Sequence, residues 1–356
     1  MSSPSGLPLY NVHVEAGARF GERRGQPVVA SYGDVAVECA AAREGVALVD
    51  LATRGVLEVA GPGPVRLKFL QGMLTNDLAG RAPGQGCRAA LLSPRGSVQA
   101  LVRALVEKDV VRLETDFDRV LPLQKALEHY RVAAPVRFAP RPMAVLALVG
   151  PEAEAVLRRA GVEPPPAEAE SHAVATLGGQ PTRVARAGDL PGGGFVLHAA
   201  PEAAAAAWQA LLSAGARPAG LDALDVRRIE ALRPWWGDDV TEENLLHETG
   251  LVAECASFTK GCYVGQEIVA RLDARGGNVN KALRGLLREA PVASGTPVTV
   301  GGKDVGRVTT AGVSPRLGPI ALAYVHRDHF AAGTAVEAGG ATATVVTSFD
   351  EAGAIS

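Results

Sequence analysis

Residues 260–267 combine side chains that a buried strand or helix rarely carries together. They read Lys-Gly-Cys-Tyr-Val-Gly-Gln-Glu, with a thiol, an amine two residues before it, an amide and a carboxylate. Buried polar groups need partners and glycine weakens helices and strands, so this mixture is atypical of a core element. Glycine on each side of Cys262-Tyr263-Val264 allows the backbone to turn sharply and to approach another group closely. The stretch therefore predicts a functional site.

Cys262 is the first candidate for chemistry. A free cysteine has a pKa of about 8.5, and a neighbouring cation lowers that pKa and raises the thiolate population. Lys260 is placed to supply the cation if both side chains face one cavity, as residues i and i+2 of an extended strand do. The alternative is a small buried hydrophobic residue, the usual fate of cysteine. We assign that alternative to Cys39, Cys87 and Cys255, and a reactive thiol to Cys262.

Glu230 is the second candidate and lies in the run Arg-Arg-Ile-Glu-Ala-Leu-Arg at 227–233. One interpretation is an exposed helix face, in which Glu230 forms ion pairs with Arg227 and Arg233 that each contribute tenths of a kcal/mol. The other is a ligand site, in which the carboxylate accepts two N–H bonds from a planar heterocycle and Arg or Lys side chains hold a carboxylate tail. Trp235 and Trp236 would line such a pocket, although adjacent tryptophans more often divide between core and surface.

A third stretch, 271–281, is basic and flexible. It contains Arg271, Arg275 and Lys281, with Gly276-Gly277 between them. It is either a solvated loop or a contact for an anionic ligand or an RNA phosphate. The chain shows no P-loop, dinucleotide-binding glycine pattern or serine-nucleophile elbow.

The elements that must position these residues follow from hydrophobic periodicity. Residues 55–59, 87–92, 98–106 and 110–114 alternate as strands, and 65–74 and 121–130 have helical spacing. A second unit of strands and helices spans 143–214, and 221–232 reads as one helix face. From Leu283 onward, short alternating runs broken by glycine predict a small β-barrel or sandwich. We expect an α+β protein with one lobe at 1–50 and 140–220, a second at 51–139 and 221–281, and a carboxy-terminal barrel at 282–356.

Composition narrows the class of protein. The 356 residues are 47% hydrophobic with a net charge of -2, which gives no basic excess for general nucleic-acid binding. Four scattered cysteines suit neither a disulfide scaffold nor a zinc hairpin, and we expect no metal site. The amino terminus lacks a basic start and an apolar run, and no stretch approaches the length of a membrane span. We expect a monomeric cytoplasmic protein with reduced thiols.

Three motifs carry a resemblance to a known family. They are 69–77 (Phe-Leu-Gln-Gly-Met-Leu-Thr-Asn-Asp), 228–231 (Arg-Ile-Glu-Ala) and 260–267. Together they resemble the YgfZ family, relatives of the glycine cleavage T-protein (aminomethyltransferase), over most of the chain. The last motif resembles the YgfZ signature, and the first two are shared with T-proteins. The resemblance implies two α+β lobes and a β-barrel around a central cavity that binds tetrahydrofolate.

The resemblance also assigns roles to residues. Glu230 matches the glutamate that contacts the pterin ring in T-proteins. We expect Arg228, Lys260, Tyr263 and Gln266 to contact the cofactor as well, and Cys262 with Lys260 to carry the chemistry. The implied partners are iron–sulfur enzymes or cluster-assembly proteins, with an indirect link to tRNA and none to a membrane.

The chain departs from T-proteins at two positions. T-proteins carry an Asp–Asp pair after a glycine-rich turn, whereas Gln99-Ala100 follows the corresponding turn at 94–98. A neutral amide cannot accept a proton as a carboxylate does, which disfavours the glycine cleavage reaction. Leu232 stands where the family commonly has glycine, which affects the local bend.

The function expected from these features is tetrahydrofolate binding in support of iron–sulfur cluster assembly or repair, including the clusters of enzymes that thiolate tRNA. One alternative is a folate-dependent aminomethyltransferase or demethylase that uses another base. A second is a scaffold without chemistry that docks cluster enzymes or tRNA through residues 271–281.

Overall fold

A computed structural model describes residues 7–352, and the chain divides into two compact units. The first unit contains the described residues of 1–91, 100–224 and 255–264, and the second those of 92–99, 225–254 and 265–356. Residues 1–6, where the sequence shows no leader pattern, lie outside the described part. Each unit is therefore assembled from segments that are far apart in the sequence.

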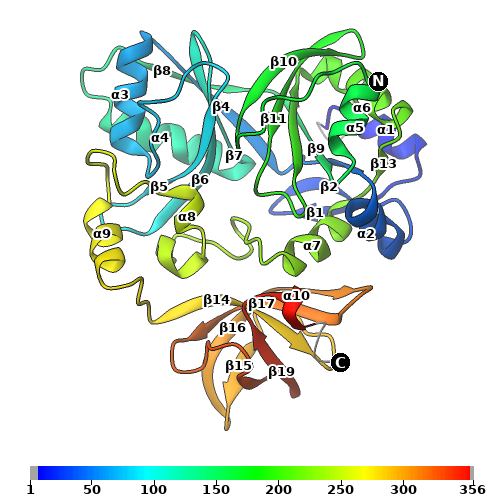
Figure 1. Ribbon diagram of the computed structural model, residues 1–356, viewed down its shortest axis with the longest axis vertical. Coiled ribbons are helices and arrows are strands. Elements are labelled where there is room, and N and C mark those ends of the chain that lie inside the picture. Colours follow the sequence, from blue (N-terminus) through cyan, green and yellow to red (C-terminus); the bar gives the residue numbers. More distant parts are fainter. Residues whose placement is uncertain (1–6, 353–356) are drawn as a thin grey trace. The chain divides into compact units, whose positions relative to one another are not determined.

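The first unit contains a six-stranded sheet in the order β10-β11-β12-β9-β3-β13, in which β10 and β11 are green in Figure 1. Its strands are β3 (Ala47–Asp50), β9 (Ala144–Val149), β10 (His172–Leu177), β11 (Gln180–Arg186), β12 (Gly194–Ala199) and β13 (Arg217–Pro218). The accompanying helices are α1 (Tyr10–Glu15), α2 (Val35–Glu44), α5 (Ala153–Arg159) and α6 (Ala204–Ser213). Trp208 of α6 is fully buried in the core of this layer, against apolar side chains of β9 and β12.

The same unit contains a five-stranded sheet in the order β5-β6-β7-β4-β8. Its strands are β4 (Arg54–Ala60), β5 (Gly86–Leu92), β6 (Val98–Val106), β7 (Val110–Asp116) and β8 (Arg137–Arg141). The helices beside it are α3 (Gly63–Met73) and α4 (Val120–Tyr130) (Figure 1). Leu70 and Met73 of α3 and Leu123 and Leu127 of α4 are buried in one apolar core with the strands, as their helical spacing requires.

The second unit is built on a closed barrel in the order β14-β17-β16-β15-β18-β19. Its strands are β14 (Lys281–Arg288), β15 (Pro297–Val300), β16 (Lys303–Ser314), β17 (Gly318–His326), β18 (Ala335–Ala338) and β19 (Ala341–Val346). The remaining elements with residues in this unit are the second half of α7 (Leu221–Glu230), α8 (Val252–Cys255), α9 (Gln266–Ala274), α10 (Phe349–Ala352) and the 3-10 turn η3 (Leu246–Thr249). Closure leaves the barrel without open strand edges.

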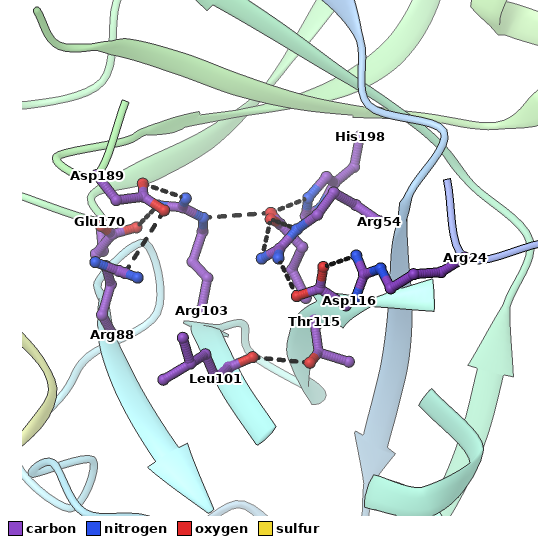
Figure 2. A network of polar contacts seen from close by, with 11 residues as sticks. Arg24, Arg54, Arg88, Leu101, Arg103, Thr115, Asp116, Glu170, Asp189 and His198 are labelled. Atoms are coloured by element: carbon purple, nitrogen blue, oxygen red, sulfur yellow. Dashed lines mark hydrogen bonds and ion pairs between the residues drawn. The ribbon is translucent and has the colours of Figure 1, made fainter. Parts of the chain in front are cut away.

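A buried network of charged side chains lies between strands of the two sheets of the first unit (Figure 2). Arg103 of β6 donates to Glu114 of β7 at 3.2 Å, to Asp189 at 2.6 Å and to Glu170. His198 of β12 contacts the same Glu114 through Nε2 at 2.9 Å. Burial alone would raise the pKa of Glu114, but the charges of Arg103, Arg54 and His198 outweigh burial and hold this pKa well below its usual range. The network therefore links the two sheets through ionised groups.

The expected fold class, two mixed α+β lobes with a carboxy-terminal β-barrel, is confirmed. The hairpin of β1 (Arg19–Arg23) and β2 (Gln26–Ser31) was not predicted from the sequence, and of the basic stretch 271–281 residues 271–274 belong to α9. The expected domain boundaries stay a prediction. No helix of the described residues combines the length and apolarity that crossing a membrane requires.

Candidate functional site

Lys260 closes the carboxyl end of α3. Its Nζ donates to the main-chain oxygens of Gln71 at 2.6 Å, Leu74 and Asn76 at 3.1 Å. The last carbonyls of a helix have no partner within the helix, and a cation there also interacts favourably with the helix dipole. Burial lowers the pKa of Lys260 to about 8, against the opposing effect of Asp77 and Cys87. The ammonium thus holds α3 and the loop after it in place.

The residues that follow Lys260 contact Lys260 itself and the carboxyl end of α3. The ring of Tyr263 lies 4.7 Å from Lys260 Nζ, and burial raises the pKa of Tyr263 to about 12. The main-chain N–H of Val264 donates to the oxygen of Gly72 at 3.2 Å. Residues 260–264 of the second motif, almost 190 residues further along the chain, therefore meet the motif at 69–77 in the first unit.

Cys262 is the exposed cysteine of the chain, whereas Cys39, Cys87 and Cys255 are buried. Burial raises the pKa of Cys87 to about 12, which makes that thiol inert. Residues 261–263, which include Cys262, belong to no strand, so a shared strand face does not bring Lys260 and Cys262 together. The reactivity of Cys262 stays a prediction that now depends on its exposure.

Gly265 brings the turn before α9 close to the turn between β5 and β6. Its φ is +81°, and a Cβ at this position would lie 2.6 Å from the main-chain oxygen of Ser93. The close approach expected of this glycine is therefore confirmed. Gly261, in contrast, has open space around it and needs no special backbone conformation. Gln266 is the first residue of α9, directly after this contact.

Gln99 follows the turn that Gly265 contacts, and both belong to the second unit. The turn is closed by a 2.8 Å bond between the hydroxyls of Ser93 and Ser97. Gly96 in the turn has φ +80°, and a Cβ there would lie 2.7 Å from Cβ of Ile268 in α9. The side chain of Gln99 is half-buried and donates weakly to Ser97 Oγ at 3.3 Å. The expected correspondence of Gln99 with a T-protein carboxylate stays a prediction.

Glu230 is buried, with 7% of its surface exposed. One carboxylate oxygen accepts from the hydroxyl of Ser314 at 2.5 Å, and the other accepts from Arg227. The interpretation of Glu230 as part of an exposed helix face is wrong, and Arg233 pairs with Glu254 instead. Ser314 was not found by sequence reasoning, because it lies 84 residues away without a motif of its own.

Arg228 is fully buried in the second unit. Its guanidinium donates to Asp225 at 2.6 Å, to Asp239 at 2.5 Å and to Thr310 of β16 at 3.0 Å. It also lies 5.1 Å from the ring of Trp235. A contact between Arg228 and the cofactor stays a prediction, but these bonds give the side chain a structural role. They connect α7 to the barrel.

Leu232, which stands where the family commonly has glycine, adopts the left-handed conformation with φ +52°. A side chain there costs about 1–2 kcal/mol relative to glycine. Leu232 also packs against the apolar cluster of the barrel that contains Ile229 and Leu283, which offsets part of this cost. The bend after Glu230 is therefore kept despite the substitution.

The candidate residues fall into two groups by unit. Lys260, Cys262 and Tyr263 belong to the first, and Arg228, Glu230 and Gln266 to the second. Within the second unit, Glu230 has the chemistry that a pterin requires. Its carboxylate is buried within the second unit, and its two oxygens are held by Ser314 and Arg227.

Comparisons with known proteins show which family models, relatives and solved structures the chain resembles. Residues 9–257 match the GCVT N-terminal domain and residues 281–348 the glycine cleavage T-protein C-terminal barrel domain. The aminomethyltransferase of Symbiobacterium thermophilum is 32% identical over 93% of this chain and 92% of its own length. That of a Thermus thermophilus strain is 33% identical over 89% of this chain and 90% of its own length. The crystal structure of the glycine cleavage system aminomethyltransferase T from Bartonella henselae superposes with a TM-score of 0.86, at 25% identity over 96% of both chains. The expected YgfZ branch stays a prediction at a finer level. Both domain matches and this similarity over nearly the whole length show that the chain belongs to the glycine cleavage T-protein family.

Proposed function

We propose that this chain is a tetrahydrofolate-dependent one-carbon transferase of the aminomethyltransferase type. The observation that carries the proposal is the buried carboxylate of Glu230 in a chain that matches both T-protein domains. Family membership supports tetrahydrofolate as the cofactor. Two N–H donors of the pterin ring complement the two oxygens of a carboxylate, and hydrogen bonds to an ionised acceptor are the stronger kind. Tetrahydrofolate supplies the nitrogen atoms that accept a one-carbon unit.

Gln99 separates the proposed reaction from that of the glycine cleavage system. A carboxylate at this position can take up a proton during transfer, and an amide cannot. The chain must therefore move the proton through another group, or use a donor that has no proton to lose. Glu230, held by Ser314, orients the pterin in this proposal and takes no part in proton transfer.

The test is calorimetric titration of the full chain with tetrahydrofolate. We expect saturable binding to the wild type and a loss of about tenfold or more in affinity for Glu230→Gln, because a neutral acceptor forms weaker bonds. Glu337→Gln, an exposed change on β18, is the matched control and should bind as the wild type does. Absence of binding to the wild type, or equal binding by both variants, contradicts the proposal.

A second measurement addresses the reaction. With a lipoyl-bound aminomethyl donor, we expect the wild type to form little methylene-tetrahydrofolate and Gln99→Asp to form more, because this change restores the missing carboxylate. Rapid product formation by the wild type would show that the carboxylate is dispensable.

A second candidate function is favoured by the exposed thiol of Cys262 within the 260–267 motif. Here the folate-bound protein supports iron–sulfur enzymes or cluster-assembly proteins, with an indirect effect on tRNA thiolation. In a deletion strain, Cys262→Ala should then fail to restore iron–sulfur enzyme activities while its folate affinity stays unchanged. Thr259→Ala, an exposed neighbour, is the control. Full restoration by Cys262→Ala would sink this candidate and leave the transferase proposal intact.

A further inference from the structure

A groove of about 520 Å³ runs along α3 in the first unit, apart from the residues assigned above to folate. Its wall contains apolar side chains from α3, from the loop at 79–83 and from the end of β6, among them Leu67, Pro83 and Val106. Its charged lining residues are Arg66, Lys68, Arg81, Glu107 and Lys108. Pockets of this volume accept small organic molecules.

The charges around the groove are strongly unbalanced. Its one carboxylate, Glu107, is already paired with Arg112 at 2.5 Å and Arg183 at 2.6 Å. Lys68 and Lys108 are exposed, and within residues 7–352 neither forms an ion pair with an acidic side chain. The groove therefore presents a net positive field that no side chain of the described residues neutralises.

Arg66 is a buried cationic side chain among the residues that line the groove, with 3% of its surface exposed. Its two terminal nitrogens donate to main-chain oxygens of Gly61 at 2.7 Å, Glu107 at 2.8 Å and Lys108 at 2.6 Å. Its Nε is buried and has no hydrogen-bond partner. Because this Nε is enclosed by the protein, Arg66 contributes its positive charge to the groove rather than a donor that a ligand contacts.

The amino end of α3 adds to the same field. The helix begins at Gly63 after Pro62, without a side-chain cap and without an acidic residue in its first turn. The free N–H groups and the positive end of the helix dipole there attract anions. Gly63 and Pro64 also line the groove, so the helix end and the four cationic side chains act on one space.

We propose that this groove binds a small organic anion, with a carboxylate or phosphate group held by Lys68, Lys108 and Arg81, with the buried charge of Arg66 adding to the attraction, and with an apolar body against Leu67 and Val106. The apolar wall disfavours a fully hydrated inorganic ion as the natural ligand, because only an attached hydrocarbon gains from burial there. The site is distinct from the folate proposal and does not depend on it.

Calorimetric titrations of the full chain at low ionic strength test the proposal, with inorganic phosphate and glutarate as probes. We expect at least one probe to bind, and the double variant Lys68→Gln/Lys108→Gln to lose about tenfold or more in affinity, equivalent to about 1.4 kcal/mol. Both changes are at exposed side chains, so the fold should be retained. Lys125→Gln/Lys303→Gln, which removes two exposed lysines elsewhere, is the matched control.

The two probes distinguish the sources of the anionic group. Binding of phosphate alone identifies a phosphorylated ligand, binding of glutarate alone a carboxylic acid, and binding of both an oxyanion site of broad selectivity. No binding of either probe up to about 10 mM, a free energy weaker than about 3 kcal/mol, overturns the proposal. So does binding that the double variant leaves unchanged, or that the control weakens equally.

Discussion

Lys260 and Cys262 are neighbours in one motif, but the fold gives their side chains different surroundings. Lys260 and Cys262 are two residues apart, yet the ammonium is directed to carbonyls of residues 71–76 while the thiol is exposed. The lysine is therefore first a positioning residue. Any effect of its charge on Cys262 comes in addition to three hydrogen bonds that fix the segment.

Thiol accessibility gives a first prediction at the residue scale. In the folded protein, a disulfide reagent should titrate one thiol per chain, Cys262, and in denaturant all four cysteines. Buried thiols such as Cys87, whose pKa is raised to about 12 by burial, cannot form the thiolate that attacks the reagent. Cys262→Ser should abolish the native signal. A native signal that survives this change would show that a buried cysteine is accessible.

Lys260 gives a second prediction, on pH. The unfolded chain keeps the lysine proton up to its ordinary pKa of 10.5, whereas burial lets the folded chain release it near 8. Between these values the unfolded state binds more protons, so raising the pH favours the folded state. The unfolding free energy of the wild type should therefore rise relative to that of Lys260→Met between pH 8 and 10. Urea titrations measure this difference, with Lys303→Met as the exposed control, and parallel pH profiles would contradict it.

At the scale of elements, helix ends and turns are held by contacts with segments that are far away in the sequence. The carboxyl end of α3 is closed by a lysine 186 residues further along the chain, because no side chain near the helix end takes that role. The turn between β5 and β6 contacts α9 through Gly96 and Gly265, where a Cβ would clash. These contacts place Gln99 and Gln266 in one unit, although each belongs to a locally ordinary element.

The prediction at the scale of elements concerns the buried network of charged side chains in Figure 2. Arg103→Met should lower the unfolding free energy by about 3–5 kcal/mol at pH 7, because it leaves Glu114, Glu170 and Asp189 buried without their shared cation. Arg158→Met, which breaks an exposed pair with Glu154 on α5, should cost less than about 1 kcal/mol.

Measurements at lower pH distinguish an electrostatic cause from a packing cause for the unfolding free energy that Arg103→Met loses. Glu114 has a lowered pKa in the wild type, so its contribution to stability is present above the ordinary pKa of a carboxyl group and is lost as the pH falls through the folded-state value. In Arg103→Met these carboxylates lose one of their cations, although Glu114 keeps Arg54 and His198, and they take up protons at higher pH than in the wild type. The difference between the two proteins in urea titrations should therefore narrow from pH 7 to 5. A difference that does not change with pH would assign the loss to packing.

At the scale of the molecule, the chain forms two units, and each contains a buried arginine that binds several carboxylates. Arg103 is the centre of a network in the first unit, and Arg228 connects α7, Asp239 and the barrel strand β16 in the second. The two arginines should consequently stabilise different units, which can be measured separately.

Hydrogen exchange measures that separation. Arg228→Met should speed exchange in peptides of β16 and β17, and leave peptides of β6 and β7 near wild-type rates, because its partners Asp225, Asp239 and Thr310 all lie in the second unit. The expected loss is about 3–5 kcal/mol, since the carboxylates lose their buried cation. Arg271→Met, which breaks an exposed pair on α9, is the control. Equal acceleration in both units would show that they unfold together.

The sequence by itself determined the elements whose signals are local. The periodicity at 121–130 matches α4 (Val120–Tyr130), and the alternation at 98–106 matches β6 (Val98–Val106), because burial of one face imposes a repeat on neighbouring residues. The short, glycine-broken runs after Leu283 likewise predict the barrel strands. The motifs at 69–77 and 228–231 pointed to the T-protein family, which the comparisons show, whereas the YgfZ branch indicated by 260–267 stays a prediction.

Only the tertiary structure decided what those residues touch. Nothing near Glu230 in the sequence predicts the hydroxyl of Ser314, and nothing near Lys260 predicts the end of α3. The structure alone also shows that the irregular segment 260–265 is held by bonds from Lys260 and Val264 to residues 71–76. Hydrogen bonds and charges act over a few ångströms in space whatever the separation along the chain, so their partners appear only once the chain has folded.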